Sequence, residues 1–170
     1  MAMHVAGMPR AAGRLNRGRA GEVQVLIAAG FDEAAVAGCI DPLVGAGLEV
    51  ILVSQATRWV VGRHGLKAKA TLTIDQARAR PLPRALVVPG DAACVSALWA
   101  DPRVHTLLVE ALSAGTVVAA LRDSQVPLAR MAVVAEGGPP NLLTQDARSL
   151  SDFIQVVVAR VSKAQSASIR

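Results

Sequence analysis

Five short, aliphatic-rich runs recur along the chain, and each is followed closely by a glycine, a proline or a residue that can cap a helix. They lack a sustained alternation of apolar and polar side chains, so strands formed by them need cover on both faces. Amphipathic stretches with helical spacing lie between runs. The pattern predicts a mostly parallel sheet with helices on both faces. The predicted strands are Val23–Ala28, Leu48–Val53, Ala85–Val88, Thr116–Leu121 and Met131–Ala135.

Local signals place helices and a hairpin between these strands. Asp32 and the pair Asp101-Pro102 predict helix N-termini, and Ser149 with Asp152 resembles a capping box before a last helix. The core must be aliphatic, because the 170 residues include only four aromatic side chains. Three further segments are predicted. Trp59–Val61 and Leu66–Thr73 form a hairpin, Ala77–Arg84 is a polar connector, and Leu142–Thr144 is a short extended piece.

Residues 1–21 differ in composition from the rest of the chain. They contain four arginines and no acid, so most of the net charge of +5 lies here, and the remainder carries about +1. Because this remainder is nearly neutral and has only four scattered aromatic residues, it lacks the basic, aromatic-rich surface typical of nucleic-acid binding, and we do not expect nucleic acid as a partner. An organellar targeting segment is disfavoured by the absence of serine and threonine. We predict a basic, disordered leader at 1–21, a single domain at 22–163 and a frayed tail at 164–170.

The usual signals of metal, nucleotide and membrane proteins are missing from the sequence. Cys39 and Cys94 are far apart and form no C-x-x-C pair, which indicates a reducing, cytoplasmic environment without a disulfide framework. The histidines lack metal-ligand spacing, and no glycine-rich phosphate-binding motif occurs. We therefore expect no metal and no cofactor. The longest apolar runs have about nine residues, too few to cross a bilayer, so no membrane association is expected.

An ordered series of segments is similar to the ThiJ/PfpI family, a branch of the class I glutamine-amidotransferase-like superfamily. The similarity extends over about residues 22–163. It implies a flavodoxin-like three-layer sandwich with a β-hairpin at one edge, and a homodimer. The segments that carry it are Val23–Glu33, Gly62–Ala70, Ala85–Gly90 and Asn141–Thr144.

The residues that this resemblance would make catalytic are replaced. Active members carry a nucleophilic cysteine on a strained turn between strand and helix, and Arg122 stands at that position. The glutamate that pairs with the thiol falls on Ala35, and the family's P-G-G loop ends here in Asp91. Arginine stays protonated and cannot act as a nucleophile at neutral pH. The stretch between Arg122 and Asn141 is also short for the family, which implies a trimmed or rearranged sheet edge after the fourth strand.

Three turns follow predicted strands and are candidates for the ligand site, because ligands of parallel sheets bind beyond the carboxyl ends of strands. They are Gly30–Glu33, Pro89–Ala93 and Leu121–Ser124. Arg122 could bind a small anionic ligand through its planar fork. Alternatively, it could plug the pocket by pairing with a nearby acid. The candidate ligand-binding residues are Arg122, Gly90, Asp91 and Ser124, and the candidate pairing acids are Asp91, Asp123 and Glu33.

Two further hypotheses stand beside the first, which is a catalytically degenerate protein with a binding, regulatory or structural role. In the second, a divergent hydrolase, glyoxalase or deglycase uses Cys94 as a relocated nucleophile, with Asp91, Asp123 or Glu33 as acid or base. The alternative interpretation is that Cys94 is a small side chain buried in the core, with no catalytic role. In the third, the arginine leader binds nucleic acid or an anionic surface. The loss of both members of the acid–thiol pair favours the first hypothesis.

Overall fold

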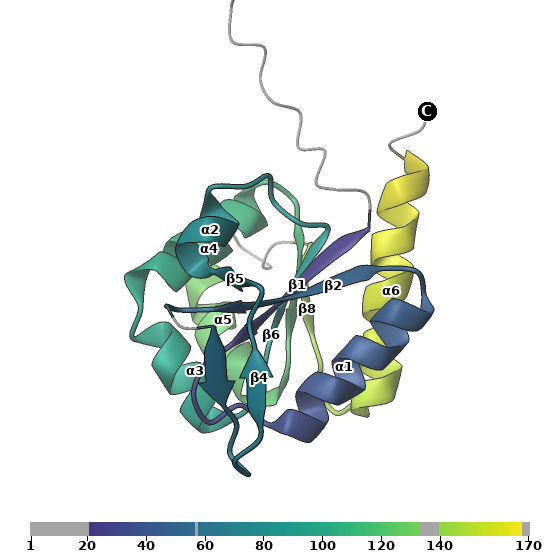
Figure 1. Cartoon of the computed structure of the whole chain (residues 1–170). Helices are drawn as coiled ribbons and strands as arrows, with labels where there is room; N and C mark the ends of the chain where they lie inside the picture. The colour runs from purple at the N-terminus through teal and green to yellow at the C-terminus, as the bar shows by residue number, and fades with distance from the viewer. Residues whose placement is uncertain (1–20, 57, 133–139, 168–170) are drawn as a thin grey trace, which may run out of the picture.

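The computed structural model describes residues 21–56, 58–132 and 140–167 and contains a six-stranded parallel sheet (Figure 1). The predicted parallel α/β architecture is confirmed, and four of the five aliphatic runs form its central strands. In spatial order the strands are β5 (Leu72–Thr73), β2 (Glu49–Ser54), β1 (Glu22–Ile27), β6 (Ala85–Val88), β7 (Val117–Ala120) and β8 (Leu142–Thr144).

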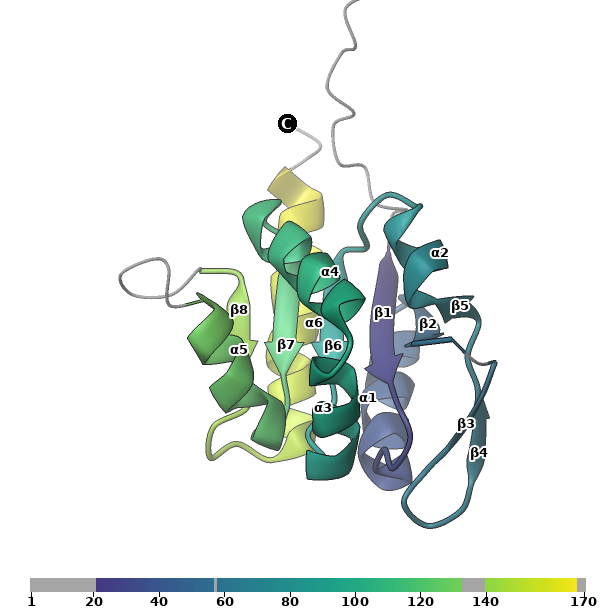
Figure 2. The same ribbon diagram turned by 90° about the vertical axis from the view of Figure 1, so that its left-hand side faces the viewer.

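The direction of the crossovers determines which face each helix covers. From β1 the chain moves one way to β2, whereas β6, β7 and β8 follow one another in the opposite direction. Since crossovers are right-handed, helices on the two paths cover opposite faces. Figure 2 shows α1 and α6 behind the sheet and α3 and α4 in front of it. The strand order therefore reverses between β1 and β6, where a ligand site is expected in such sheets.

Most of the helices begin at a side chain that caps their first turn. Asp32, Asp91 and Asp101 each accept a hydrogen bond from a backbone N–H of the helix that follows. At the last helix, Ser149 Oγ accepts from the backbone N–H of Asp152 at 3.1 Å. The helices are α1 (Glu33–Gly45), α2 (Ile74–Arg78), α3 (Ala92–Trp99), α4 (Pro102–Ser113), α5 (Gln125–Ala132) and α6 (Leu150–Ala167).

Aliphatic side chains fill both layers between sheet and helices, as the composition requires. All six residues of β1 are buried, and so are all four residues of β6 and of β7. Among the described residues, Phe153 of α6 is the largest fully buried side chain. β1, β6 and β7 therefore form the buried centre of the sheet, and the turns at their carboxyl ends start from it.

The predicted hairpin forms, but its second arm divides between two sheets. β3 (Trp59–Val61) and β4 (Lys67–Lys69) pair antiparallel and stand beside the β2–β5 edge (Figure 2). Leu72 and Thr73, which were predicted to lie in the same arm, instead pair with β2 as strand β5. The expected connector 77–84 begins inside α2, a five-residue helix with a capping box at Thr73.

The predicted fifth strand, Met131–Ala135, is wrong at its start. Met131 and Ala132 are the last residues of α5, and 133–135 lie outside the described residues. Leu142–Thr144 takes the next place in the sheet and pairs with β7. At the other end of the chain, α6 continues to Ala167, so the first residues of the expected tail are helical. The expected leader lies almost wholly outside the described residues.

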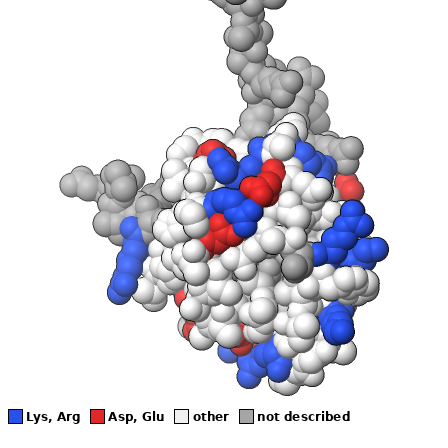
Figure 3. All heavy atoms as spheres, turned by 60° about the vertical axis from the view of Figure 1, so that its left-hand side comes forward, with Lys and Arg blue, Asp and Glu red and all other residues white. Residues whose placement is uncertain are grey.

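The charged side chains show no continuous basic stripe on the face seen in Figure 3, where separate groups of lysine and arginine lie among uncharged residues and a few acids. No described helix is both long enough and apolar enough to cross a bilayer.

Candidate functional site

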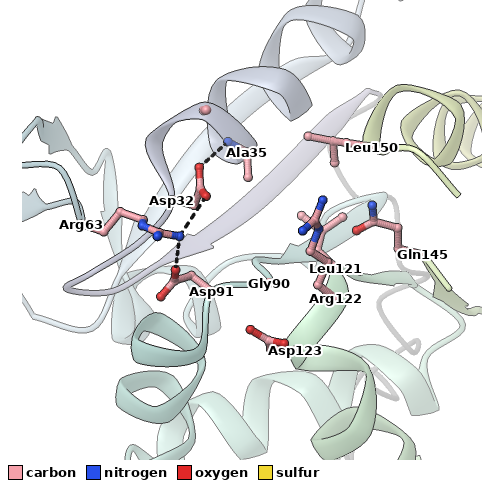
Figure 4. A pocket seen from close by; sticks show the side chains of 11 residues that line it. Asp32, Ala35, Arg63, Gly90, Asp91, Leu121, Arg122, Asp123, Gln145 and Leu150 are labelled. Atoms are coloured by element: carbon pink, nitrogen blue, oxygen red, sulfur yellow. Dashed lines mark hydrogen bonds and ion pairs between the residues drawn. The ribbon is translucent and has the colours of Figure 1, made fainter. Parts of the chain in front are cut away.

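The three turns singled out in the sequence meet at the carboxyl end of the sheet and border one pocket (Figure 4). They follow β1, β6 and β7, so the pocket lies where the strand order reverses. Its volume is about 390 Å³. Small-molecule sites commonly occupy a few hundred cubic ångströms, so the space suits a small ligand.

The turn after β7 holds Arg122 in a left-handed backbone conformation. Its φ is +34°, which is uncommon for a residue with a side chain. The Leu121 N–H donates to the Val88 carbonyl at 3.0 Å, and the Asp123 N–H donates to the Gly90 carbonyl at 3.3 Å. These bonds join the turn after β7 to the last residue of β6 and to the turn that follows it. The strained turn that the resemblance implies is therefore present, with an arginine at its apex.

Gly90 and Ser124 support this turn. A Cβ added at Gly90 would lie 2.8 Å from the Arg122 Cβ and 2.9 Å from the Leu121 carbonyl, so only glycine lets the two turns approach this closely. Ser124 is fully buried, and its hydroxyl lies 2.7 Å from the Leu121 carbonyl and 3.2 Å from that of Val88. Ser124, a predicted ligand-binding residue, does not line the pocket; it stabilises the turn beneath Arg122.

The Arg122 side chain is exposed at the pocket and extends between the start of α1 and the start of α6 (Figure 4). Within the described part of the chain it forms no ion pair with Asp91, Asp123 or Glu33. The predicted plug is therefore not formed. Two of these acids already have other partners, which leaves the guanidinium available to a ligand.

Arg63 is the partner of the acids on the opposite side of the pocket. It projects from the hairpin, and its Nη1 lies 3.0 Å from Asp91 Oδ2 and 3.4 Å from Asp32 Oδ2. The other oxygens of these carboxylates accept from the backbone N–H groups of Ala35 and Ala93. Arg63 was missed by the analysis of the sequence, although it lies in the Gly62–Ala70 segment that carries the resemblance.

Glu33, a candidate acid or base, instead anchors the hairpin. Its carboxylate accepts from the backbone N–H groups of His64 at 2.8 Å and Leu66 at 3.3 Å, and it lies 2.8 Å from His64 Nδ1. Burial alone would raise the pKa of Glu33, but the hydrogen bonds from its own N–H, from His64 and from Leu66 outweigh it and lower the pKa to about 2. Glu33 is therefore ionised at neutral pH and does not line the pocket.

Glu33→Gln is expected to lower stability in a way that depends on pH. A carboxyl whose pKa falls from 4.5 in the unfolded chain to about 2 in the folded one stabilises the fold above pH 4.5 and loses this effect as the pH falls toward 2. The difference in free energy of unfolding between wild type and Glu33→Gln should be largest at pH 6 and shrink toward pH 3 in urea titrations. Glu110→Gln, which removes an exposed carboxylate, is the control. A pH-independent difference for Glu33→Gln would contradict this role of Glu33.

Cys94 is buried and does not line the pocket. The residue is fully buried, and its Sγ accepts from the backbone N–H of Ala28 at 3.3 Å. Burial raises the pKa of Cys94 to about 11 and that of Cys39 to about 12. A thiolate is the reactive form, so both positions are unfavourable for a nucleophile. Among the described residues, no group of three or more histidine, cysteine or acidic side chains is placed to hold a metal ion.

Comparisons with known proteins identify the family and agree with the fold. The sequence model of the DJ-1/PfpI family matches residues 21–137. No match appears among curated proteins. Three solved structures are similar in fold: a DJ-1 superfamily protein from Salmonella typhimurium, DJ-1 from Toxoplasma gondii in its oxidized form, and a ThiJ/PfpI domain protein from Brachyspira murdochii.

The similarity to these structures extends over most of each chain. The Salmonella protein is 23% identical, with a TM-score of 0.70 over 88% of this chain and 97% of its own. The Toxoplasma protein is 16% identical, with a TM-score of 0.72 over 88% and 98%. The Brachyspira protein is 18% identical, with a TM-score of 0.73 over 86% and 99%. At these identities the structures establish the flavodoxin-like fold.

Proposed function

Because the chain belongs to the DJ-1/PfpI family yet carries an arginine on the turn where the nucleophile is expected, we propose that it is a ligand-binding protein without the family's thiol chemistry. Its pocket takes a small molecule that bears a carboxylate. The observation that carries this proposal is Arg122, exposed at the pocket and without an ion-pair partner in the described part of the chain.

The chemistry of arginine supports binding rather than catalysis. The guanidinium remains charged at every physiological pH and presents parallel N–H donors that match the two oxygens of a carboxylate. The strained backbone at Arg122 and its bonds to the turn after β6 hold the base of the side chain in place. The surrounding wall includes Ala35 and Leu150, which carry no charge. A carboxylate next to them would be partly removed from water, which strengthens its bond to Arg122.

The groups that would be needed for thiol catalysis do not meet in the pocket. Ala35, to which the resemblance assigns the position of the family's glutamate, lines the pocket with a methyl group. Both native thiols are buried, and their pKa values are raised. This argues against the hypothesis of Cys94 as a relocated nucleophile.

The oligomeric state and location belong to the proposal as well. Homologues in the family are commonly dimeric, and we infer that this chain also forms a homodimer. We place it in the cytoplasm, because its two cysteines are far apart in sequence and remain free.

Arg122→Ala is expected to weaken carboxylate binding by about tenfold or more, since a hydrogen bond to a charged group contributes about 1.5–3 kcal/mol. Arg122→Lys keeps the charge but loses the paired donors of the guanidinium. Its carboxylate affinity should therefore lie between those of the wild type and Arg122→Ala. Isothermal titration calorimetry with acetate, lactate and succinate measures the affinities. Arg160→Ala, which removes an exposed arginine of α6 that does not line this pocket, is the charge-matched control.

Two results would overturn the proposal. One is an affinity for these carboxylates that Arg122→Ala leaves unchanged. The other is turnover of an ester, a 2-oxoaldehyde or a glycated amine by the purified protein, abolished by Arg122→Ala but not by Arg160→Ala.

A further inference from the structure

The charges around the pocket are of both signs and are not evenly distributed. Three carboxylates, of Asp32, Asp91 and Asp123, face two guanidinium groups, of Arg63 and Arg122. In Figure 4, Arg63, Asp32 and Asp91 occupy one side and Arg122 the other, with Asp123 at the base near Asp91. A simple anion on Arg122 would therefore lie in a pocket whose acids outnumber its basic groups.

Most of these charges are already neutralised by one another. Asp32 and Asp91 share Arg63, and each also accepts a backbone N–H at a helix start. Together these three side chains still carry one excess negative charge. Among the described residues Asp123 has no ion pair or side-chain hydrogen bond, as is also true of Arg122. The pocket thus offers one available cation and one available anion.

The backbone fixes the relation between these two groups. Arg122 and Asp123 are neighbours on the short 3-10 turn Arg122–Ser124, and the Asp123 N–H is bonded to the Gly90 carbonyl. The left-handed conformation at Arg122 directs the two side chains to different parts of the pocket (Figure 4). A ligand that reaches both must therefore carry two separated charges of opposite sign.

We propose that the pocket selects a zwitterionic amino-carboxylate, with its carboxylate bound by Arg122 and its ammonium group bound by Asp123. This rests on the proposed function and names the class of its ligand. The excess negative charge of the Arg63 group lies on the Asp123 side and adds to the attraction for the ammonium group. A carboxylate without an amine gains only the contact with Arg122 and meets the repulsion of the acids. Selection thus comes from two effects: Asp123 attracts the ammonium group of the zwitterion, and the acids of the pocket repel a carboxylate that has no amine.

Matched pairs of ligands test this inference by calorimetry: glycine with acetate, β-alanine with propionate, and γ-aminobutyrate with butyrate. The spacer length varies between pairs, whereas the amine is the difference within each. At least one zwitterion is expected to bind about tenfold or more tightly than its partner, since charge-assisted hydrogen bonds supply differences of this size. Asp123→Asn should remove this preference without lowering the affinity for the matched carboxylate.

Asp41→Asn is the control, because it neutralises an exposed acid of α1 that does not line the pocket. It should retain the full preference. If the carboxylates bind through Arg122 but no zwitterion is preferred, or if Asp123→Asn weakens both members of a pair equally, the zwitterion proposal is overturned and the proposed function stands. If neither member of any pair binds, the proposed function fails, and the zwitterion proposal with it.

Discussion

Arg122→Cys is expected to introduce a thiol that reacts with iodoacetamide at least about a hundredfold faster than either native cysteine. The turn at this position exposes its side chain, whereas Cys39 and Cys94 are fully buried. A thiol with an ordinary pKa is about 3% ionised at pH 7, and one with a pKa of about 11 only about 0.01%. The difference in thiolate fraction alone exceeds a hundredfold, and exposure adds to it.

Mass spectrometry of the native protein over a time course measures this effect, because each alkylated thiol adds a fixed mass. The wild type shows the rate of the buried cysteines, and Arg160→Cys shows that of an ordinary exposed thiol on a helix. If the thiol introduced by Arg122→Cys reacted as slowly as the native ones, the turn would not present its side chain to the pocket. A reaction as fast as that of Arg160→Cys would show that the turn presents the side chain at position 122 to solvent at the pocket.

Gly90→Ala is expected to reduce the free energy of unfolding by about 1–3 kcal/mol, which is the range for overpacking at a tight site. The added methyl group would meet the Leu121 carbonyl at 2.9 Å and the Arg122 Cβ at 2.8 Å. Backbone atoms cannot move aside as the end of a flexible side chain can. The two turns must separate, which weakens the bonds of Leu121 and Asp123 to the turn after β6. Urea denaturation at pH 7 measures the loss.

Gly45→Ala is the matched control for this prediction. Gly45 ends α1, and a Cβ there would meet no atom within 4 Å apart from its own neighbours along the helix. Alanine favours helix over glycine by up to about 1 kcal/mol, so this variant should equal the wild type or exceed it in stability. Equal effects of the two substitutions would show that the close approach at Gly90 does not determine the cost.

The central strands could be predicted from the sequence because β1, β2, β6 and β7 are short aliphatic runs with a turn or capping signal soon after. The run Met131–Ala135 has the same composition, but apolar runs of this length do not distinguish a buried strand from the end of a helix. Here the helix that begins at Gln125 continues through Ala132. α2 was missed because five residues show no helical period, although its capping pair, Thr73 and Gln76, is visible in the sequence.

The location of the site could be predicted from the order of strands and turns, but the ion pairs within it could not. Parallel strands bring the turns after them to one edge of the sheet, so the meeting of three turns needs no knowledge of side chains. Which arginine pairs with Asp91 depends on a hairpin whose position is fixed by Glu33, His64 and Leu66 over long sequence distances. The sequence offered Arg122 as a candidate partner of that acid, but Arg63 pairs with it, and Arg122 forms no ion pair among the described residues.

The pocket is assembled from five separate stretches of the chain. In the unfolded protein these stretches have no fixed relation, so a ligand of the pocket binds the native state alone. Binding and folding are then a single linked equilibrium: at a free ligand concentration one hundred times the Kd, occupancy adds about 2.7 kcal/mol to the free energy of unfolding. The natural ligand can therefore be recognised among many compounds by its effect on the thermal midpoint, without any assay of chemistry.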